Sequence, residues 1–130
     1  MRLLVDTHLA IWAVTNDARL SSRAQALLTD PQNSTFVSAA SIWEIALKHR
    51  LARDRADMPI SGEDAVRFFE RAGFQLLPVS PAHAAAIDQL RTVRADPFDL
   101  LLLAQANSEP MRLVTHDARL AGHDGSIIRV

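Results

Sequence analysis

Two aspartates follow directly behind short apolar runs, where their carboxylates could carry out chemistry. Asp6 follows residues 3–5, and Asp117 follows residues 113–115 after one intervening residue. Short apolar runs of this kind are typical of buried strands, and in parallel α/β sheets ligand sites form beyond the carboxyl ends of the strands. We therefore expect both carboxylates at one edge of a sheet. The alternative is that each aspartate only caps the next helix or loop, because Asp is common at such junctions.

Two further acids are expected on helices. Glu44 lies within the apolar segment 39–47, where a carboxylate is costly to bury unless it is paired or bound to a cation. Its alternative is an exposed pair with Lys48, four residues on, which would stabilise the helix by only about 0.2–0.5 kcal/mol. Asp96 is predicted to cap a helix with proline at its first position, and Asp99 to point from that helix into a crevice.

Together these side chains predict a metal site. The four site acids, as we call them, are Asp6, Glu44, Asp99 and Asp117. If they converge, their charges repel one another unless a cation lies between them. Oxygen ligands alone suit Mg²⁺ or Mn²⁺ rather than zinc. Thr7 and Thr115 lie close to two of these acids in the sequence and could hydrogen-bond a carboxylate or a water on the metal.

The elements that must position the acids alternate along the chain. Apolar runs predict strands at residues 2–5, 35–37, 75–79, 112–115 and 127–130. Caps and apolar periodicity predict helices at residues 9–14, 21–28, 39–51, 61–73, from 80 onward and 96–107. Strands alternating with helices at this spacing predict an α/β fold in which helices cover both faces of a parallel sheet.

Composition limits the function classes. The chain of 130 residues is expected to form one domain over residues 1–130. It has no cysteine, which excludes disulfides, thiolate metal sites and cysteine nucleophiles and fits a reducing cytoplasm. No apolar segment has the length of a membrane span, and we expect a cytoplasmic protein. The net charge of −1 argues against a broad basic surface for nucleic acids, but bound divalent ions can supply positive charge locally.

The sequence resembles PIN domains, and specifically the VapC-type toxin ribonucleases of bacterial toxin–antitoxin modules. The segments that carry the resemblance are residues 3–8 (LLVDTH), 38–48 (SAASIWEIALK), 96–106 (DPFDLLLLAQA) and 113–117 (LVTHD). They occur in the family's order and at its spacing across essentially the whole chain. Each segment is weak on its own, whereas the ordered set is specific.

This resemblance implies a three-layer α/β/α sandwich with a central parallel sheet and an acidic Mg²⁺ or Mn²⁺ site. The four site acids take the places of the family's catalytic and metal-binding acids, with Asp96 as an assisting acid. An RNA substrate, a homodimer and a cognate antitoxin protein are also implied. The chain departs from the subgroup at Ala95 and Leu100, where basic residues usually flank Asp96 and Asp99.

The implied reaction is hydrolysis of an RNA phosphodiester by a water that the metal orients and activates. Glu44 or a hydroxide on the metal would be the base, and the sequence leaves this choice, the number of ions and a DNA substrate open. One alternative is a catalytically silent PIN scaffold that binds proteins. A weaker one is a phosphatase or phosphotransfer domain with Asp6 as nucleophile, although His8 stands where a dehalogenase-like phosphatase needs a second aspartate.

The remaining ring side chains have less specific expectations. Trp12 and Trp43 each follow an isoleucine in an apolar helix, and we expect them in the core or at a dimer surface rather than stacked on bases. His8 and His116 lie beside site acids and could contact phosphate. No pair of histidines has the spacing of a metal-binding motif.

Overall fold

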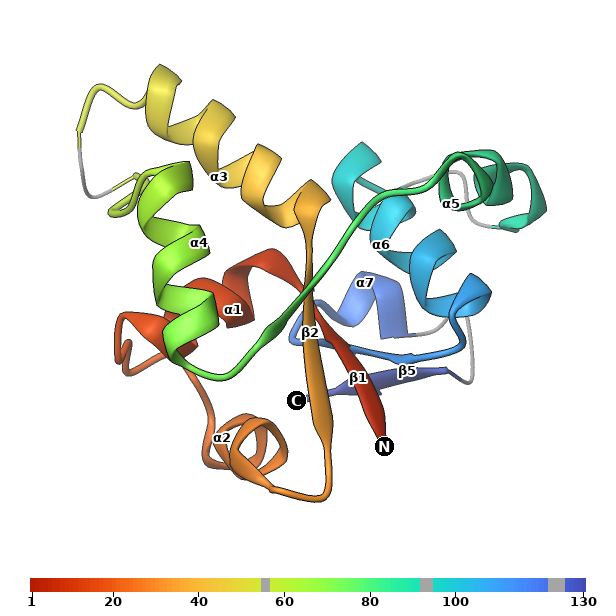
Figure 1. The fold of residues 1–130 in the computed structure, drawn as a ribbon, viewed down its shortest axis with the longest axis horizontal. Coiled ribbons are helices and arrows are strands. Elements are labelled where there is room, and N and C mark those ends of the chain that lie inside the picture. Colours follow the sequence, from red (N-terminus) through yellow and green to blue (C-terminus); the bar gives the residue numbers. More distant parts are fainter. Residues whose placement is uncertain (55–56, 92–94, 122–125) are drawn as a thin grey trace.

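Five parallel strands form the sheet at the centre of the molecule, in the order β3-β2-β1-β4-β5 (Figure 1). The structure is a computed structural model and describes residues 1–54, 57–91, 95–121 and 126–130. The strands are β1 (Arg2–Val5), β2 (Ser34–Ser38), β3 (Gln75–Leu77), β4 (Arg112–Thr115) and β5 (Ile127–Arg129). The predicted α/β class and parallel sheet are confirmed.

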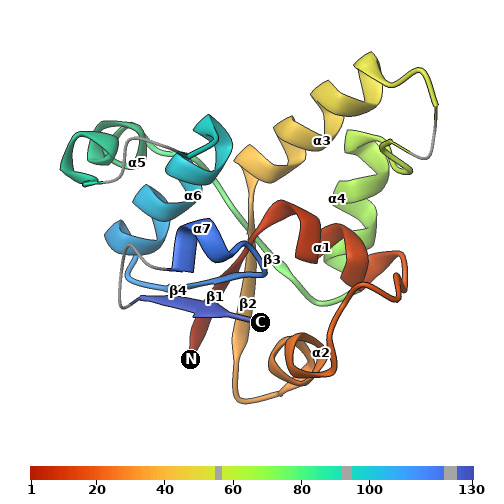
Figure 2. The ribbon, with the colours of Figure 1, turned by 180° about the vertical axis from the view of Figure 1, so that it is seen from behind.

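Helices cover both faces of this sheet, as Figures 1 and 2 show. One face carries α1 (Thr7–Val14), α2 (Ser22–Thr29), α3 (Ala39–Leu51) and α4 (Gly62–Arg71). The other side carries α5 (Pro81–Ala85), the 3₁₀ helix η1 (Ala86–Gln89), α6 (Pro97–Ser108) and α7 (Ala118–Ala121). The three-layer arrangement expected from the resemblance is therefore present. None of the helices in the described ranges has the length and apolar character to cross a bilayer.

The position of the central strand β1 between two layers of helices explains why its residues are apolar without alternation. Leu3 and Val5 pack into the core beneath α1–α4, whereas Leu4 packs into the core on the α6 side. All three side chains are fully buried. A strand covered on both faces has no solvent side, so a continuous apolar run replaces the alternating pattern of a half-exposed strand.

The strand register brings the sequence-predicted site to one edge. Leu4 pairs with Phe36 of β2 and with Leu113 of β4, so the three strands end side by side. Asp6 and Ser38 follow as N-caps of α1 and α3, each accepting a hydrogen bond from a backbone N–H of its helix. Helices α1 and α3 therefore both begin at the edge of the sheet where β1 and β2 end.

One predicted element is shorter than expected. β3 ends at Leu77 rather than at residue 79. Pro78 has no N–H to donate to a strand ladder, which explains why pairing stops there. The sheet edge at β3 is therefore short, and the chain turns from it into α5.

Helices α3 and α4 touch at a point that has no room for a side chain. A Cβ atom placed on Gly62, the first residue of α4, would lie 2.8 Å from the Cβ of Ala46 in α3. Real Cβ atoms do not approach so closely, because interiors are packed to crystal density. Gly62 therefore sets how near α4 lies to α3, the helix that carries Glu44.

We expect Gly62→Ala to lower the free energy of unfolding by about 1–3 kcal/mol, because α3 and α4 must separate to admit the methyl group. Urea denaturation followed by circular dichroism measures this loss. The variant Ala46→Gly removes the opposing methyl group, so the double variant should lose less than the sum of the two single variants. Strict additivity would contradict the contact.

Candidate active site

Asp6 is buried at the end of β1, and both of its carboxylate oxygens have partners. One oxygen, Oδ1, accepts a hydrogen bond from the backbone N–H of Leu9 at 2.9 Å. The other, Oδ2, accepts from the hydroxyl of Thr115 at 2.5 Å. The capping role considered as an alternative for Asp6 is thus real, and it fixes the carboxylate against the end of β4 as well.

The two threonines position the site in different ways. Thr115 donates to Asp6 and its hydroxyl accepts a hydrogen bond from the backbone N–H of Asp117 at 3.0 Å, so it links two of the acids. Thr7 donates to the hydroxyl of Ser41 at 2.8 Å and joins α1 to α3 in the buried interior. Thr115 therefore contacts the acids directly, whereas Thr7 positions the helix that carries Glu44.

Glu44 is buried, and it also forms the ion pair with Lys48 that the sequence suggested. Its carboxylate is 5% exposed and its Oε2 accepts a hydrogen bond from Lys48 Nζ at 2.6 Å. Its Oε1 is buried and has no hydrogen-bond partner among the described residues. A buried carboxylate oxygen without a donor is energetically costly, so this atom is the clearest place at the edge for a cation.

Asp99 shows that the acids lie close together. Burial, as the largest cause, and the negative charges of Asp96, Asp6, Glu44 and Asp117 together raise the pKa of its carboxyl to about 6. A carboxyl takes up a proton more readily beside other carboxylates, because ionisation would add like charge. The other three site acids and Asp96 therefore lie within electrostatic range of Asp99. Asp96 itself caps α6 as predicted, accepting from the N–H of Phe98 at 2.8 Å.

Asp117 lies at the rim of the cluster and is held by a neighbouring arginine. Arg119 donates from Nε and Nη2 to the two carboxylate oxygens at 3.1 and 2.9 Å. This pairing lowers the pKa of Asp117. Both ion pairs, Glu44 with Lys48 and Asp117 with Arg119, place an internal cation on a carboxylate that could otherwise bind a metal.

Arg119 was not predicted from the sequence, but a signal for it exists. Residues 17–20 and 117–120 have the same sequence, Asp-Ala-Arg-Leu. In the first copy, Arg19 donates from Nε and Nη2 to Asp17 at 3.0 and 2.7 Å, as Arg119 does to Asp117. The two copies form the same hydrogen bonds between the aspartate and the arginine, although the first lies in a turn and the second begins α7, so an arginine two residues after the aspartate indicates a paired carboxylate in this chain.

His116 connects the acids to a group of rings. Its Nδ1 lies 3.7 Å from Asp6 Oδ2, and the interaction with Asp6 raises the pKa of the imidazole. Its ring centre lies 4.7 Å from that of Trp12 and 5.9 Å from that of His8. Trp12 is 9% exposed, so its predicted packing in the core is confirmed. His116 therefore lies at the site, while no contact in the structure tests a role in holding phosphate.

The acid cluster fits a hard divalent cation in its chemistry. Within the ranges that the structure describes, no three carboxylate or imidazole groups already lie close enough to share one ion. Lys48 and Arg119 form ion pairs with two of the carboxylates. The donors are all oxygens, as Mg²⁺ and Mn²⁺ prefer, and Oε1 of Glu44 is still without a partner.

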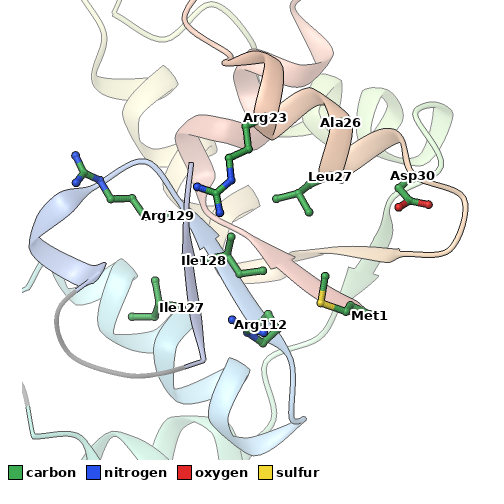
Figure 3. A pocket seen from close by; sticks show the side chains of 9 residues that line it. All are labelled: Met1, Arg23, Ala26, Leu27, Asp30, Arg112, Ile127, Ile128 and Arg129. Carbon is green, nitrogen blue, oxygen red and sulfur yellow. The ribbon is translucent and has the colours of Figure 1, made fainter.

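A pocket on another part of the surface is not part of this site. It lies between α2 and the strands β4 and β5, and Arg23, Arg112 and Ile128 are among its lining residues (Figure 3). None of the four site acids lines it. The acidic edge, rather than this pocket, contains the residues that could carry out chemistry.

Comparisons with known proteins agree with this fold. The family model described as PIN domain matches residues 3–125, and the chain belongs to that family. No protein of curated function matches the sequence at a significant level.

Among solved structures, the chain is similar to a chain of VapBC2 from Rickettsia felis bound to a promoter DNA fragment. The TM-score is 0.71 and the sequence identity is 15%, and the match covers 100% of this chain and 98% of that one. It is also similar to DNA-bound VapBC from Salmonella typhimurium (TM-score 0.67, 16% identity, 100% and 97% covered). A third is VapC20 from Mycobacterium tuberculosis, a toxin that cleaves the sarcin–ricin loop (TM-score 0.62, 18% identity, 98% and 99% covered). At these identities the likeness is one of fold.

The raised pKa of Asp99 makes the stability of the metal-free protein depend on pH. Because folding raises this pKa from 3.8 to about 6, the folded state takes up a proton between these values, and stability is lost as the pH rises through them. The full shift corresponds to about 3 kcal/mol, and solvent screening of this half-exposed group reduces it to about 1 kcal/mol.

We therefore expect Asp99→Asn to gain about 1 kcal/mol of stability relative to the parent protein between pH 4.5 and pH 7.5. Urea denaturation of both proteins in EDTA at the two pH values measures the gain. A difference that is constant with pH would contradict the raised pKa of Asp99.

The hydroxyl of Thr115 can be tested with two substitutions, one that keeps the size of the side chain and one that keeps the hydroxyl. Thr115→Val removes the donor to Asp6 and the acceptor for the N–H of Asp117, and should lower the free energy of unfolding by about 1–3 kcal/mol. Thr115→Ser keeps the hydroxyl and is the matched control, so it should lose less. Thermal unfolding measures both, and equal losses would show that the hydroxyl does not hold the edge together.

Proposed function

We propose that this chain is a Mg²⁺- or Mn²⁺-dependent endoribonuclease that hydrolyses RNA phosphodiester bonds and acts as the toxin of a toxin–antitoxin pair. The observation that supports the proposal is that Asp6, Glu44, Asp96 and Asp117 lie near enough to Asp99 for their charges to act together with burial in raising its pKa to about 6. Groups of like charge are kept together in this way where a cation is to be bound.

The four site acids, Asp6, Glu44, Asp99 and Asp117, are the proposed ligands and catalytic residues. A bound divalent ion would supply positive charge for the phosphoryl oxygens and lower the pKa of the attacking water. Water forms a bond to phosphorus as the bond to one ester oxygen breaks, and that leaving oxygen takes up a proton. Glu44 or a hydroxide on the ion would accept the proton from the water.

The other residues of the edge keep the ligands in place. Thr115 holds Asp6, and the bond between Thr7 and Ser41 keeps α3 against α1, so Glu44 cannot swing away from the sheet. Asp96 adds a further negative charge beside Asp99. We assign Asp96 an assisting role, in drawing the cation toward the ligands.

The substrate and partners are proposed from the relatives. A fold match is described as a toxin that cleaves the sarcin–ricin loop, and other matches are VapBC complexes. By extension we propose for this chain an RNA substrate in the cytoplasm, a homodimer and a cognate antitoxin protein. The acids would then be the part of the surface that an antitoxin must block.

A catalytically silent scaffold is the second candidate, and one observation favours it. Lys48 and Arg119 occupy Glu44 and Asp117, as they would in a protein that never binds metal. In the ribonuclease these two side chains must instead give way to the ion. Metal-dependent activity separates the two proposals.

We expect the purified protein to cleave single-stranded RNA in Mn²⁺ and to lose all cleavage in EDTA. Asp6→Asn should abolish cleavage while leaving the fold intact, because the asparagine oxygen can still accept from the N–H of Leu9. Gel analysis of a panel of RNA oligonucleotides measures cleavage, and circular dichroism checks the fold.

The matched control is Asp30→Asn, which makes the same change on an aspartate that directly follows α2, before the start of β2. It should cleave like the parent protein. Full activity of Asp6→Asn, or activity that persists in EDTA, would refute the proposed ribonuclease. Growth arrest on expression of the parent protein, relieved in the Asp6→Asn variant, is expected of a toxin.

A further inference from the structure

Trp43 lies on the surface of the chain, which excludes the core as its place and leaves the expected alternative of a dimer surface untested. Its residue is 60% exposed, whereas Trp12 is almost fully buried. Its ring meets that of Phe98 at a centroid distance of 5.1 Å and an angle of 64°. Rings at this angle do not stack face to face but stand like two walls that meet. We call Trp43 and Phe98 together the aromatic corner.

The aromatic corner adjoins the acidic edge through both of its residues. Trp43 directly precedes Glu44 in α3, and Phe98 directly precedes Asp99 in α6. The beginnings of α3 and α6 lie side by side in both views of the fold (Figures 1 and 2). Any nucleotide whose phosphate reaches the four site acids therefore brings its neighbouring bases close to the two rings.

The charges around the aromatic corner favour a neutral ring, rather than a second protein surface, as the group that binds there. Glu44 and Asp99 follow the two rings directly, and Asp96 lies two residues before Phe98. Interface cores between proteins are depleted in charged residues. A second copy seated here would also bring its own acidic edge against this one, at the cost of like-charge repulsion. A nucleobase carries no charge and offers a flat π-face.

We propose that Trp43 and Phe98 form a stacking site for one nucleobase of the RNA, next to the phosphate that is cleaved. This inference rests on the proposed ribonuclease and names positioning residues for it. Trp43 offers the exposed stacking face, and Phe98 fixes the orientation of the Trp43 ring by its edge contact. Base–aromatic stacking tolerates any sequence, because every base has a π-face.

The test compares cleavage by the parent protein, Trp43→Ala and Trp43→Phe in Mn²⁺. Loss of one stacked base corresponds to about a fivefold to hundredfold fall in kcat/KM. We expect Trp43→Ala to fall within this range and Trp43→Phe to recover much of the loss. Leu51→Ala is the matched control, since Leu51 is 70% exposed on the same helix and lies two turns from Trp43.

A substrate change makes the test specific for stacking. In the RNA that is cleaved best, each nucleoside flanking the cleaved bond is replaced in turn by an abasic one. At one position the abasic substrate should slow the parent protein about as much as Trp43→Ala does. The same substrate should slow Trp43→Ala no further, because the stacking partner is already absent.

Each outcome has a defined meaning. Equal cleavage by the parent protein and Trp43→Ala, or equal sensitivity of both to every abasic position, overturns the stacking site and leaves the ribonuclease intact. A change of oligomeric state in Trp43→Ala by light scattering, with unchanged cleavage of single strands, assigns the aromatic corner to a second copy and also overturns it. Absence of RNA cleavage by the parent protein overturns both proposals.

Discussion

The repulsion between carboxylates at the end of a parallel sheet is the constraint on which the architecture of this protein depends. Parallel strands necessarily bring their carboxyl ends to one edge, and here Asp6 and Asp117 leave that edge while Glu44 and Asp99 reach it from helices. The protein meets the electrostatic cost in three ways. Hydrogen bonds from Thr115 and Leu9 hold Asp6, lysine and arginine neutralise two other acids, and Asp99 keeps a proton at mildly acid pH.

The fold was largely predictable because its signals are local. Strand and helix positions followed from apolar runs and caps, and α3 begins and ends at the residues that the cap at Ser38 and the apolar run indicate. β3 was overestimated because the run continues to Val79 while Pro78 lacks the donor that pairing requires. The order of strands in the sheet, in contrast, depends on tertiary packing that no local pattern encodes.

The sequence was enough to choose candidate site residues, but not to predict their contacts. The four acids could be chosen from their places behind strands and inside apolar helices, but each had a plausible structural alternative. In the structure Asp6 does cap α1 and Glu44 does pair with Lys48, although Glu44 is buried rather than exposed, and neither contact excludes a role in binding a cation. Of the two places expected for Trp43, the core and a dimer surface, the structure excludes the core, because an apolar helix of this composition does not reveal which of its faces is left uncovered.

The two ion pairs at the edge affect how tightly the proposed site would bind a metal ion. Lys48 and Arg119 each neutralise a carboxylate in the absence of metal, so an incoming ion must compete with a tethered cation of the same chain. The concentration at which the site fills is then set partly by residues that never touch the ion. Selection could shift this threshold through positions 48 and 119, and leave every ligand unchanged.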